Sequence, residues 1–170
     1  KVGVILFSDQ IEGFIPPKKG RKHILRIIRE MLNIEPKGQG TDVGEALRYF
    51  NNVCKKRSIA FVLSDFIAND FKDALRIAAK KHDVTGIQVY DPREEVLPPV
   101  GLIRALDPET GQESWIDTSN KTTRENYEQW FRDHREKARN LFLKTGSDLL
   151  HIRTDEPYVN ALLKFFKRRH

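Results

Sequence analysis

The sequence predicts an α/β domain in which helices cover both faces of a mostly parallel sheet, in three layers. Short apolar runs rich in β-branched residues recur along the chain, and segments with apolar residues at helical spacing separate most of them. This alternation is typical of parallel sheets, because each helix returns the chain to the edge where the next strand starts. The 170 residues, 39% of them hydrophobic, have the length of one domain with a real core. We therefore expect a single domain over 1–170.

The N-terminal part is expected to hold a hairpin followed by a helix. The apolar run 2–7 predicts a strand, and 11–15 predicts a second strand that pairs back on it and stops at Pro16-Pro17. Spacings of three and four then predict a helix over 21–34, whose apolar stripe comprises Ile24, Ile27, Ile28, Met31 and Leu32.

A second helix is expected over 43–54, after a loop made flexible by its glycines. Thr41 or Asp42 is placed to cap this helix, because either side chain has an oxygen that can accept from the first free amides. The apolar stripe of the helix ends in Cys54, which we interpret as a small core hydrophobe.

The rest of the chain continues the alternation with one interruption. Strands are predicted over 59–64, 84–90 and 148–152, and helices over 70–82, 120–145 and from about 157 onward. The interruption, 93–118, is expected to be an inserted β-hairpin with a glycine turn at 107–112. Trp130 fits the core stripe of the long helix. Trp115 lies on the hairpin, where exposure on a partner surface and packing under the hairpin both remain open.

Composition and charge exclude several classes of protein. No apolar run approaches the roughly 20 residues of a membrane helix, and the single cysteine excludes a disulfide-stapled scaffold or a cysteine-rich zinc site. The net charge of +6 permits an acidic ligand, but no aromatic-interleaved basic strand supports nucleic-acid binding. The chain begins at Lys1 inside a strand, without a signal-peptide pattern, so we expect a piece of a longer cytoplasmic protein.

Polar side chains gather where the predicted strands end, which is the edge at which parallel sheets bind ligands. They are Ser8 and Asp9 after the first strand, Asp65 and Asp91 after the later strands, and Thr41 and Asp42 before the second helix. A hydroxyl and a carboxylate from separate loops suit the oxygen preference of Mg²⁺. Thr41 with Asp65 is therefore the strongest candidate pair.

The order of elements resembles that of von Willebrand factor A domains: strand, hairpin, helix, Gly-Thr-Asp loop, helix, and an apolar strand ending in Ser-Asp. Within that group, the sequence most resembles the bacterial branch called domain of unknown function 58. The resemblance is carried by VGVILFSDQIEGFIPPKKGRKHILRIIREML, GTDVGEAL, RSIAFVLSDF and HDVTGIQVYDPREEVLPPVGLI, which span roughly the first hundred residues. It implies a Rossmann-like fold whose first strand is absent from this chain.

The resemblance also implies a metal-ion-dependent adhesion site. In the family, an Asp-x-Ser-x-Ser loop, a threonine and an aspartate bind Mg²⁺ or Mn²⁺. Thr41 matches the threonine and Asp65 the aspartate, with Ser8, Asp9 and Asp42 as outer candidates. The Asp-x-Ser-x-Ser motif does not occur in this sequence. We therefore expect this chain alone to bind no metal cofactor, or to bind one weakly.

The absent strand has a second implication. In the family it would lie between the strands at 2–7 and 59–64, so its absence would leave two apolar strand edges unpaired. We expect these edges to pair with each other or with another chain, in the second case as a strand-edge dimer.

The function we expect is protein–protein interaction, without catalysis. The resemblance implies a metal-bridged contact with a partner carboxylate, and a MoxR-type AAA+ ATPase as partner in complex assembly. Two alternatives remain open. One is a Mg²⁺-dependent phosphohydrolase that uses Asp9, Asp65 and Asp91. The other is a metal-free scaffold in which Thr41 and Asp65 only cap helices.

Overall fold

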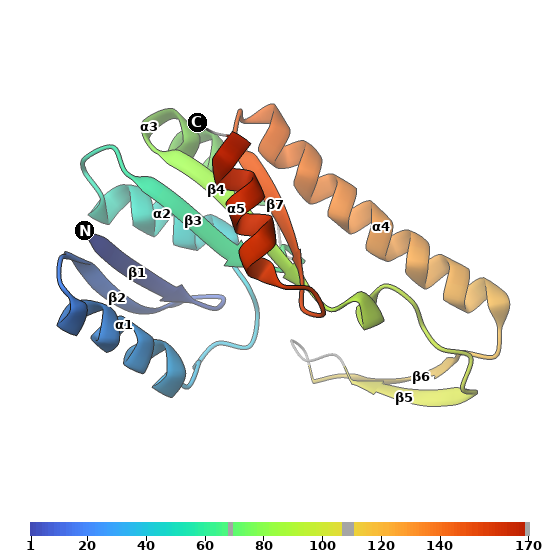
Figure 1. Ribbon diagram of the computed structural model, residues 1–170. Helices are drawn as coiled ribbons and strands as arrows, with labels where there is room; N and C mark the ends of the chain where they lie inside the picture. Colours follow the sequence, from blue (N-terminus) through green and yellow to red (C-terminus); the bar gives the residue numbers. More distant parts are fainter. Residues whose placement is uncertain (68–69, 107–110, 169–170) are drawn as a thin grey trace.

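The computed structural model describes residues 1–67, 70–106 and 111–168 and confirms the α/β class (Figure 1). The elements are, in chain order, β1 (Val2–Phe7), β2 (Ile11–Lys18), α1 (Arg21–Asn33), α2 (Val43–Val53), β3 (Ile59–Ser64), α3 (Lys72–Lys81), β4 (Asp83–Tyr90), the short 3₁₀ helix η1 (Pro92–Glu94), β5 (Leu102–Leu106), β6 (Glu113–Asp117), α4 (Lys121–Lys144), β7 (Asp148–Arg153) and α5 (Tyr158–Arg168). Most of the glycine turn predicted at 107–112 lies outside the described residues, as do Arg169 and His170.

A parallel sheet in the order β3-β4-β7 forms the centre of the molecule. Helices α2, α3 and α4 share one core on one face of this sheet, and α5 lies on the other face (Figure 1). On that second face, the ring of Phe166 in α5 lies 5.9 Å from the ring of Phe61 in β3. The buried core comprises Val43, Leu47, Phe66, Phe71, Ala74, Leu75, Ala78, Val84, Ala138 and Phe142.

Close packing of α4 on the sheet depends on a glycine in β4. A Cβ at Gly86 would lie 2.5 Å from a ring carbon of Phe142 and 2.7 Å from a methyl carbon of Leu149. Phe142 is fully buried, and its ring also contacts the rings of Phe66 and Phe71. The missing side chain in β4 therefore makes room for the fully buried ring of Phe142 in α4.

The N-terminal hairpin β1–β2 is an antiparallel pair, and β2 is longer than predicted. It continues through Pro16 and Pro17 to Lys18, which pairs with Val2. The prediction that the prolines stop this strand is therefore wrong. In the described part of the chain, β2 pairs only with β1. The other edge of β2 forms no ladder hydrogen bonds, so proline, which has no N–H to donate, is tolerated there.

The hairpin and the parallel sheet are separate sheets. The expectation that the strands at 2–7 and 59–64 pair with each other is thus wrong for the described residues. Side-chain packing through α2 connects the two sheets instead of a hydrogen-bonded ladder. Leu47 of α2 lies in the core of the parallel sheet, and Tyr49 of α2 makes an edge-to-face contact with Phe14 of β2 at 5.8 Å.

The inserted hairpin β5–β6 protrudes from the parallel sheet, beside the N-terminal end of α4 (Figure 1). Trp115 on β6 is 67% exposed, which decides between the two open interpretations in favour of exposure. Trp130 is 43% exposed, so its assignment to the core is wrong. The reason is that α4 extends beyond the sheet, and Trp130 instead lies beside the ring of His134 at 4.2 Å.

Cys54 also differs from its predicted role. It follows the last turn of α2 as the C-cap, and its N–H donates to the carbonyl of Phe50. At this helix end it is only partly buried, so it is not a core residue. Burial still raises the pKa of its thiol.

Candidate functional site at the ends of the strands

Two loops meet beside the end of β1. The amide of Asp42 donates to the carbonyl of Ser8 at 2.8 Å, which joins the β1–β2 turn to the loop before α2. A Cβ at Gly38 would lie 1.7 Å from Oδ1 of Asp9 and 2.3 Å from Oγ of Ser8. Glycine at position 38 thus lets the loop backbone approach both candidate side chains.

Glu12 holds this junction together, although it was not among the residues predicted from the sequence. Its Oε1 accepts from the hydroxyl of Ser8 at 2.6 Å and from the amides of Lys37 and Gly38 at 2.9 Å each. The Ser8 hydroxyl and the amides of Gly38 and Lys37 lower the pKa of the Glu12 carboxyl to about 2, because they stabilise its charged form. No local pattern marks Glu12, since its amide donors lie about 25 residues further along the chain.

The structure decides between the two candidate caps of α2. Asp42 is the N-cap: its Oδ1 accepts from the amide of Glu45 at 2.7 Å, and Arg48 lies 3.6 Å from its Oδ2. Thr41 comes just before the cap and is half-buried. The Thr41 hydroxyl is therefore not the cap of α2.

Asp65 follows β3 in a tight turn. Its Oδ1 accepts from the amide of Ile67 at 3.1 Å, which is an Asx turn. The next residue, Phe66, has a left-handed φ of 58° and is buried in the core. Asp65 is not a helix cap either, because the N-cap position of α3 is Phe71. The capping roles expected of Thr41 and Asp65 in the metal-free alternative are therefore wrong, and the absence of a metal from the function stays a prediction.

A buried side-chain amide from the neighbouring strand positions the Asp65 turn, and it too was not predicted from the sequence. Nε2 of Gln88 in β4 donates to the carbonyl of Asp65 at 2.7 Å. Oε1 of Gln88 is 2.9 Å from Nδ1 of His151 in β7, so that ring nitrogen donates to it. Burial, together with Arg135 and Arg139, lowers the pKa of His151. In the sequence, Gln88 is a polar residue within the otherwise mostly apolar strand predicted over 84–90, and this was the signal that could have identified it.

Asp65 lines a small cavity of about 10 Å³ at the end of β4. A cavity of this size holds about one water molecule. Its wall is built by Tyr90 and Arg135, whose guanidinium lies 4.3 Å from the centre of the Tyr90 ring and also pairs with Glu95. The cavity is thus a small packed corner, with both polar and apolar lining residues, that has no room for a substrate.

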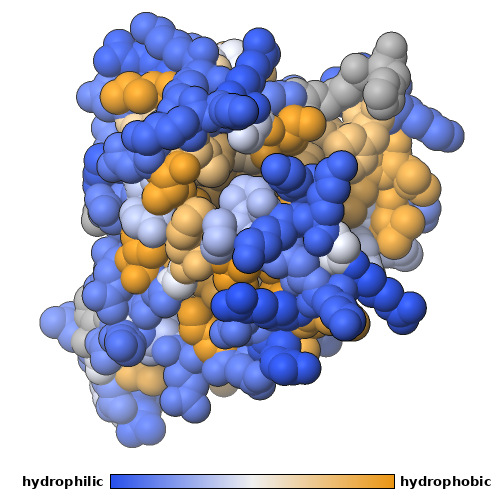
Figure 2. Space-filling view, turned by 90° about the vertical axis from the view of Figure 1, so that its left-hand side faces the viewer, coloured by the Kyte–Doolittle hydropathy of each residue, from blue (hydrophilic) through white to orange (hydrophobic). Residues whose placement is uncertain are grey.

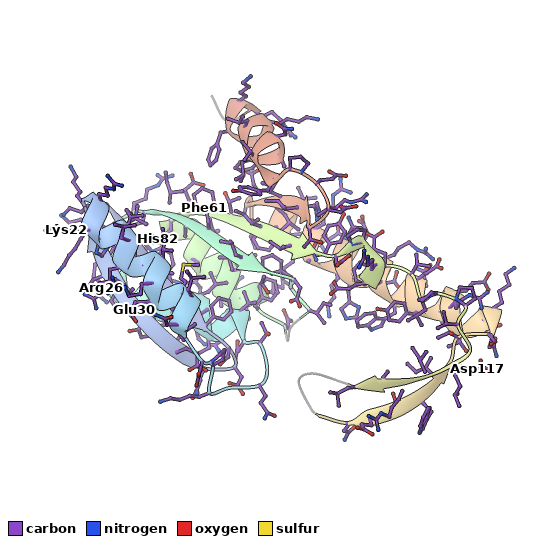
Figure 3. The ribbon with its side chains drawn as sticks, turned by 60° about the horizontal axis from the view of Figure 1, so that its bottom comes forward. Lys22, Arg26, Glu30, Phe61, His82 and Asp117 are labelled. Atoms are coloured by element: carbon purple, nitrogen blue, oxygen red, sulfur yellow. The ribbon has the colours of Figure 1, made fainter. Side chains whose placement is uncertain are left out.

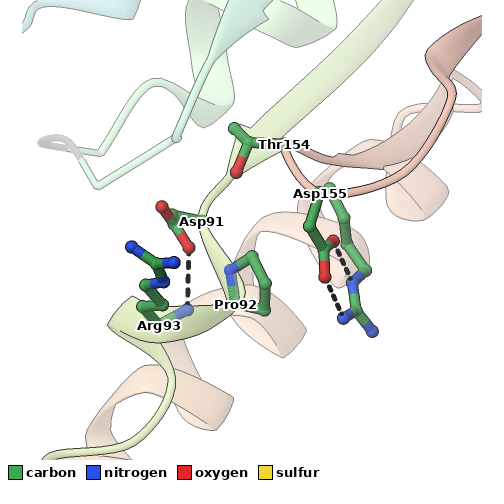
Figure 4. A pocket seen from close by; sticks show the side chains of 6 residues that line it. Asp91, Pro92, Arg93, Thr154 and Asp155 are labelled. Carbon is green, nitrogen blue, oxygen red and sulfur yellow. Dashed lines mark hydrogen bonds and ion pairs between the residues drawn. The ribbon is translucent and has the colours of Figure 1, made fainter.

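Asp91 lies in a different place, a shallow depression of about 510 Å³ (Figure 4). Its Oδ1 accepts from the amide of Arg93 at 2.9 Å and caps η1. Across the depression, Arg153 and Asp155 form a two-bond ion pair at 2.8 and 3.0 Å, and the Arg153 guanidinium lowers the pKa of Asp155. Asp65 and Asp91 line different pockets, and Asp9 lies against the loop at Gly38; their use by a phosphohydrolase stays a prediction.

Thr41 and Asp65 supply oxygen atoms, which are the type of ligand atom that Mg²⁺ prefers. Within the described ranges, no group of three or more His, Cys, Asp or Glu side chains is arranged to hold a metal. The two predicted ligands therefore form at most part of a coordination sphere.

Fold and strand-end loops together define an α/β domain with polar loops beside a parallel sheet. Residues 1–137 match the family described as "Protein of unknown function DUF58", so the chain belongs to that family. This confirms the branch named from the sequence motifs. The wider likeness to von Willebrand A domains stays a prediction.

Relatives from mycobacteria resemble the whole chain. Uncharacterised proteins of Mycobacterium tuberculosis and Mycobacterium bovis are 26% identical to it over 174 residues, covering 99% of this chain and 54% of theirs. An uncharacterised protein of Mycobacterium avium is 27% identical over 160 residues, covering 91% of this chain and 93% of its own. The chain thus spans about half the length of the first two relatives.

One solved structure is similar in fold. It is the crystal structure of an aerotolerance-related membrane protein from Bacteroides fragilis with multiple mutations to serines. The TM-score is 0.53 at 17% identity, over 95% of this chain and 75% of that one. In the part of our chain that the structure describes, no helix is long and apolar enough to cross a bilayer.

Proposed function

We propose that this chain is a protein–protein interaction module whose partner binds along the free edge of β3. The observation that supports this most is the outer face of β3, where Ile59, Phe61 and Leu63 are 67%, 40% and 57% exposed. Among the described residues, β4 is the only strand that pairs with β3, so the other edge presents unpaired amides and carbonyls. A free edge beside apolar side chains suits an added strand, which supplies main-chain hydrogen bonds and apolar contacts together.

In its more specific form, the proposal is that a bound metal ion assists partner binding. Thr41 and Asp65 would supply two oxygen ligands to Mg²⁺, and a carboxylate of the partner would complete the coordination. Two ligands are few for an ion that demands octahedral geometry and dehydrates reluctantly, so we expect weak binding in this chain alone. The family resemblance suggests a MoxR-type AAA+ ATPase as the partner, in complex assembly in the cytoplasm.

Calorimetric titration of a purified MoxR-type ATPase into this chain, with Mg²⁺ and with chelator, tests the proposal. Leu63→Asp should abolish binding, because it places a charge on the apolar edge. Asp65→Ala and Thr41→Ala should weaken it only when Mg²⁺ is present. Ile77→Asp, at an exposed apolar position on α3, is the matched control and should bind like the wild type.

The outcomes separate the two levels of the proposal. Binding by Leu63→Asp at wild-type strength would contradict the β3 edge as the binding surface. Binding that depends on Leu63 but is unaffected by chelation would keep the interaction module and remove the metal from it.

A further inference from the structure

Helix α1 exposes an apolar face that no other part of the described chain covers. It buries only Ile27, while five large apolar side chains are exposed. At 100° per residue, these five fall within one third of the helix circumference. We call this surface the α1 face, and its residues are Ile24, Leu25, Ile28, Met31 and Leu32.

Basic side chains border the α1 face along its length. Lys22, Arg26 and Arg29 follow one another at helical spacing beside the apolar residues, and all three are exposed. Figure 2 looks onto the side of the molecule where α1 and β1–β2 lie, and hydrophobic patches there stand among strongly hydrophilic surface. Residues 18–33 contain six lysines and arginines and one glutamate.

The β5–β6 hairpin has an exposed apolar face with a small acidic excess, in which Arg104 pairs with Glu113 at 3.5 Å and Asp117 is a further carboxylate. Residues directly opposite in an antiparallel pair share a face, and Arg104 is opposite Trp115 and Leu106 opposite Glu113. We call this surface the hairpin face, and its residues are Leu102, Arg104, Leu106, Glu113, Trp115 and Asp117. Its three apolar members are each more than 60% exposed.

The charge of the hairpin segment contrasts with that of the rest of the chain. Residues 91–120 contain seven aspartates and glutamates and two arginines, within a chain whose net charge is +6. Oppositely charged, partly apolar surfaces attract each other and favour one relative orientation.

From these two surfaces we infer that copies of this chain bind head to tail, with the hairpin face of one copy on the α1 face of the next. The two faces lie at opposite ends of the molecule, as the labels on Lys22, Arg26 and Asp117 in Figure 3 show, and Figure 1 agrees. One copy therefore cannot join them within itself. The inference goes beyond the proposed function, because neither face includes the β3 edge.

The dimensions of the two faces match. Thirteen residues of helix are about 20 Å long, and strands of five residues are about 17 Å long. An isolated two-stranded hairpin is marginally stable in water, and packing against a helix is one of the arrangements that stabilises it. The helix of a second copy supplies that arrangement here.

Head-to-tail contact has a recognisable consequence. Each bound pair still presents one free α1 face and one free hairpin face, so growth continues to an open chain or a closed ring. A symmetric strand-edge dimer would stop at two copies. The two modes of association therefore differ in the masses that they produce.

Sedimentation velocity over a range of protein concentrations tests the inference. The wild type should grow beyond dimer mass as concentration rises, and less so in high salt, because salt screens the charged contacts. Two double variants should each associate at least about tenfold more weakly than the wild type. They are the hairpin variant Glu113→Lys/Trp115→Ser and the helix variant Leu25→Ser/Arg29→Glu. Leu143→Ser/Lys144→Glu on α4 is the matched control and should assemble like the wild type.

Mixing the two variants provides the sharper test. The helix variant keeps an intact hairpin face and the hairpin variant keeps an intact α1 face, so a mixture should form pairs that stop at two chains. Circular dichroism confirms that each variant is folded. A monomeric wild type, a mixture that stays monomeric, or variants that assemble like the wild type would each overturn the inference. Association lost only in Leu63→Asp would assign it to the β3 edge and would also overturn it.

Discussion

Helices α1 and α3 both have apolar residues at helical spacing, but those of α3 are largely buried whereas those of α1 are mostly exposed. In α3, Leu75 and Ala78 are completely buried in the core shared with α2 and α4. In α1, Ile27 alone is buried. The difference arises because α3 packs on the parallel sheet beside two other helices, whereas α1 lies against a two-stranded hairpin that offers little surface. Apolar spacing thus specifies which face of a helix favours burial, and the neighbouring elements decide whether it is buried.

The largest expected effect comes from creating a cavity in the core that α3 shares with α2 and α4. Phe142→Ala removes a fully buried ring that contacts Phe66 and Phe71, so we expect a loss of about 3–5 kcal/mol in the free energy of unfolding. Leu25→Ala in α1, where the side chain is already exposed, should change it by less than about 0.5 kcal/mol. Urea unfolding of both variants measures the contrast. Equal losses at a protein concentration where the chain is monomeric would mean that another part of the same chain covers the α1 face.

A smaller effect is expected at the start of α2, which has a side-chain cap where α1 has only Gly20. Asp42→Ala removes the acceptor for the Glu45 amide and should cost about 1 kcal/mol. Thr41→Ala is the neighbouring control and should cost clearly less, because Asp42 makes the capping bond. The same urea experiment compares the two, and a larger loss in Thr41→Ala would show that the cap assignment is wrong.

The last expected effect is confined to acid pH and concerns the junction between the β1–β2 turn and the loop before α2. The folded pKa of Glu12 is about 2, below its ordinary value of 4.5, so the stability that Glu12 contributes is present above pH 4.5. It is lost as the pH falls from about 4.5 to about 2. Unfolding curves of Glu12→Gln across this range should show a flatter pH dependence than the wild type. Ser8→Ala, which removes one donor, should give an intermediate slope, and identical slopes in all three would refute the role of Glu12.

Local features of the site were predictable from the sequence. Asp42 was one of two candidate caps because its partner amide is only three residues away. Glu12 and Gln88 were not predictable in this way. The amides that bind Glu12 are 25 and 26 residues from it, and Gln88 reaches a carbonyl 23 residues away. No spacing rule links positions that meet only when separate elements pack together.

The sequence by itself determined the family, the order of strands and helices and the β5–β6 hairpin, and it limited the cap of α2 to Thr41 or Asp42. Each of these depends on residues near one another in the chain, where turn chemistry and apolar spacing act directly. Tertiary structure alone decided that β2 continues through its prolines, that Trp130 is exposed, that Glu12 joins two loops and that no other part of the described chain covers the α1 face. These outcomes depend on which elements become neighbours, because burial and hydrogen bonding between distant residues are properties of the packed molecule.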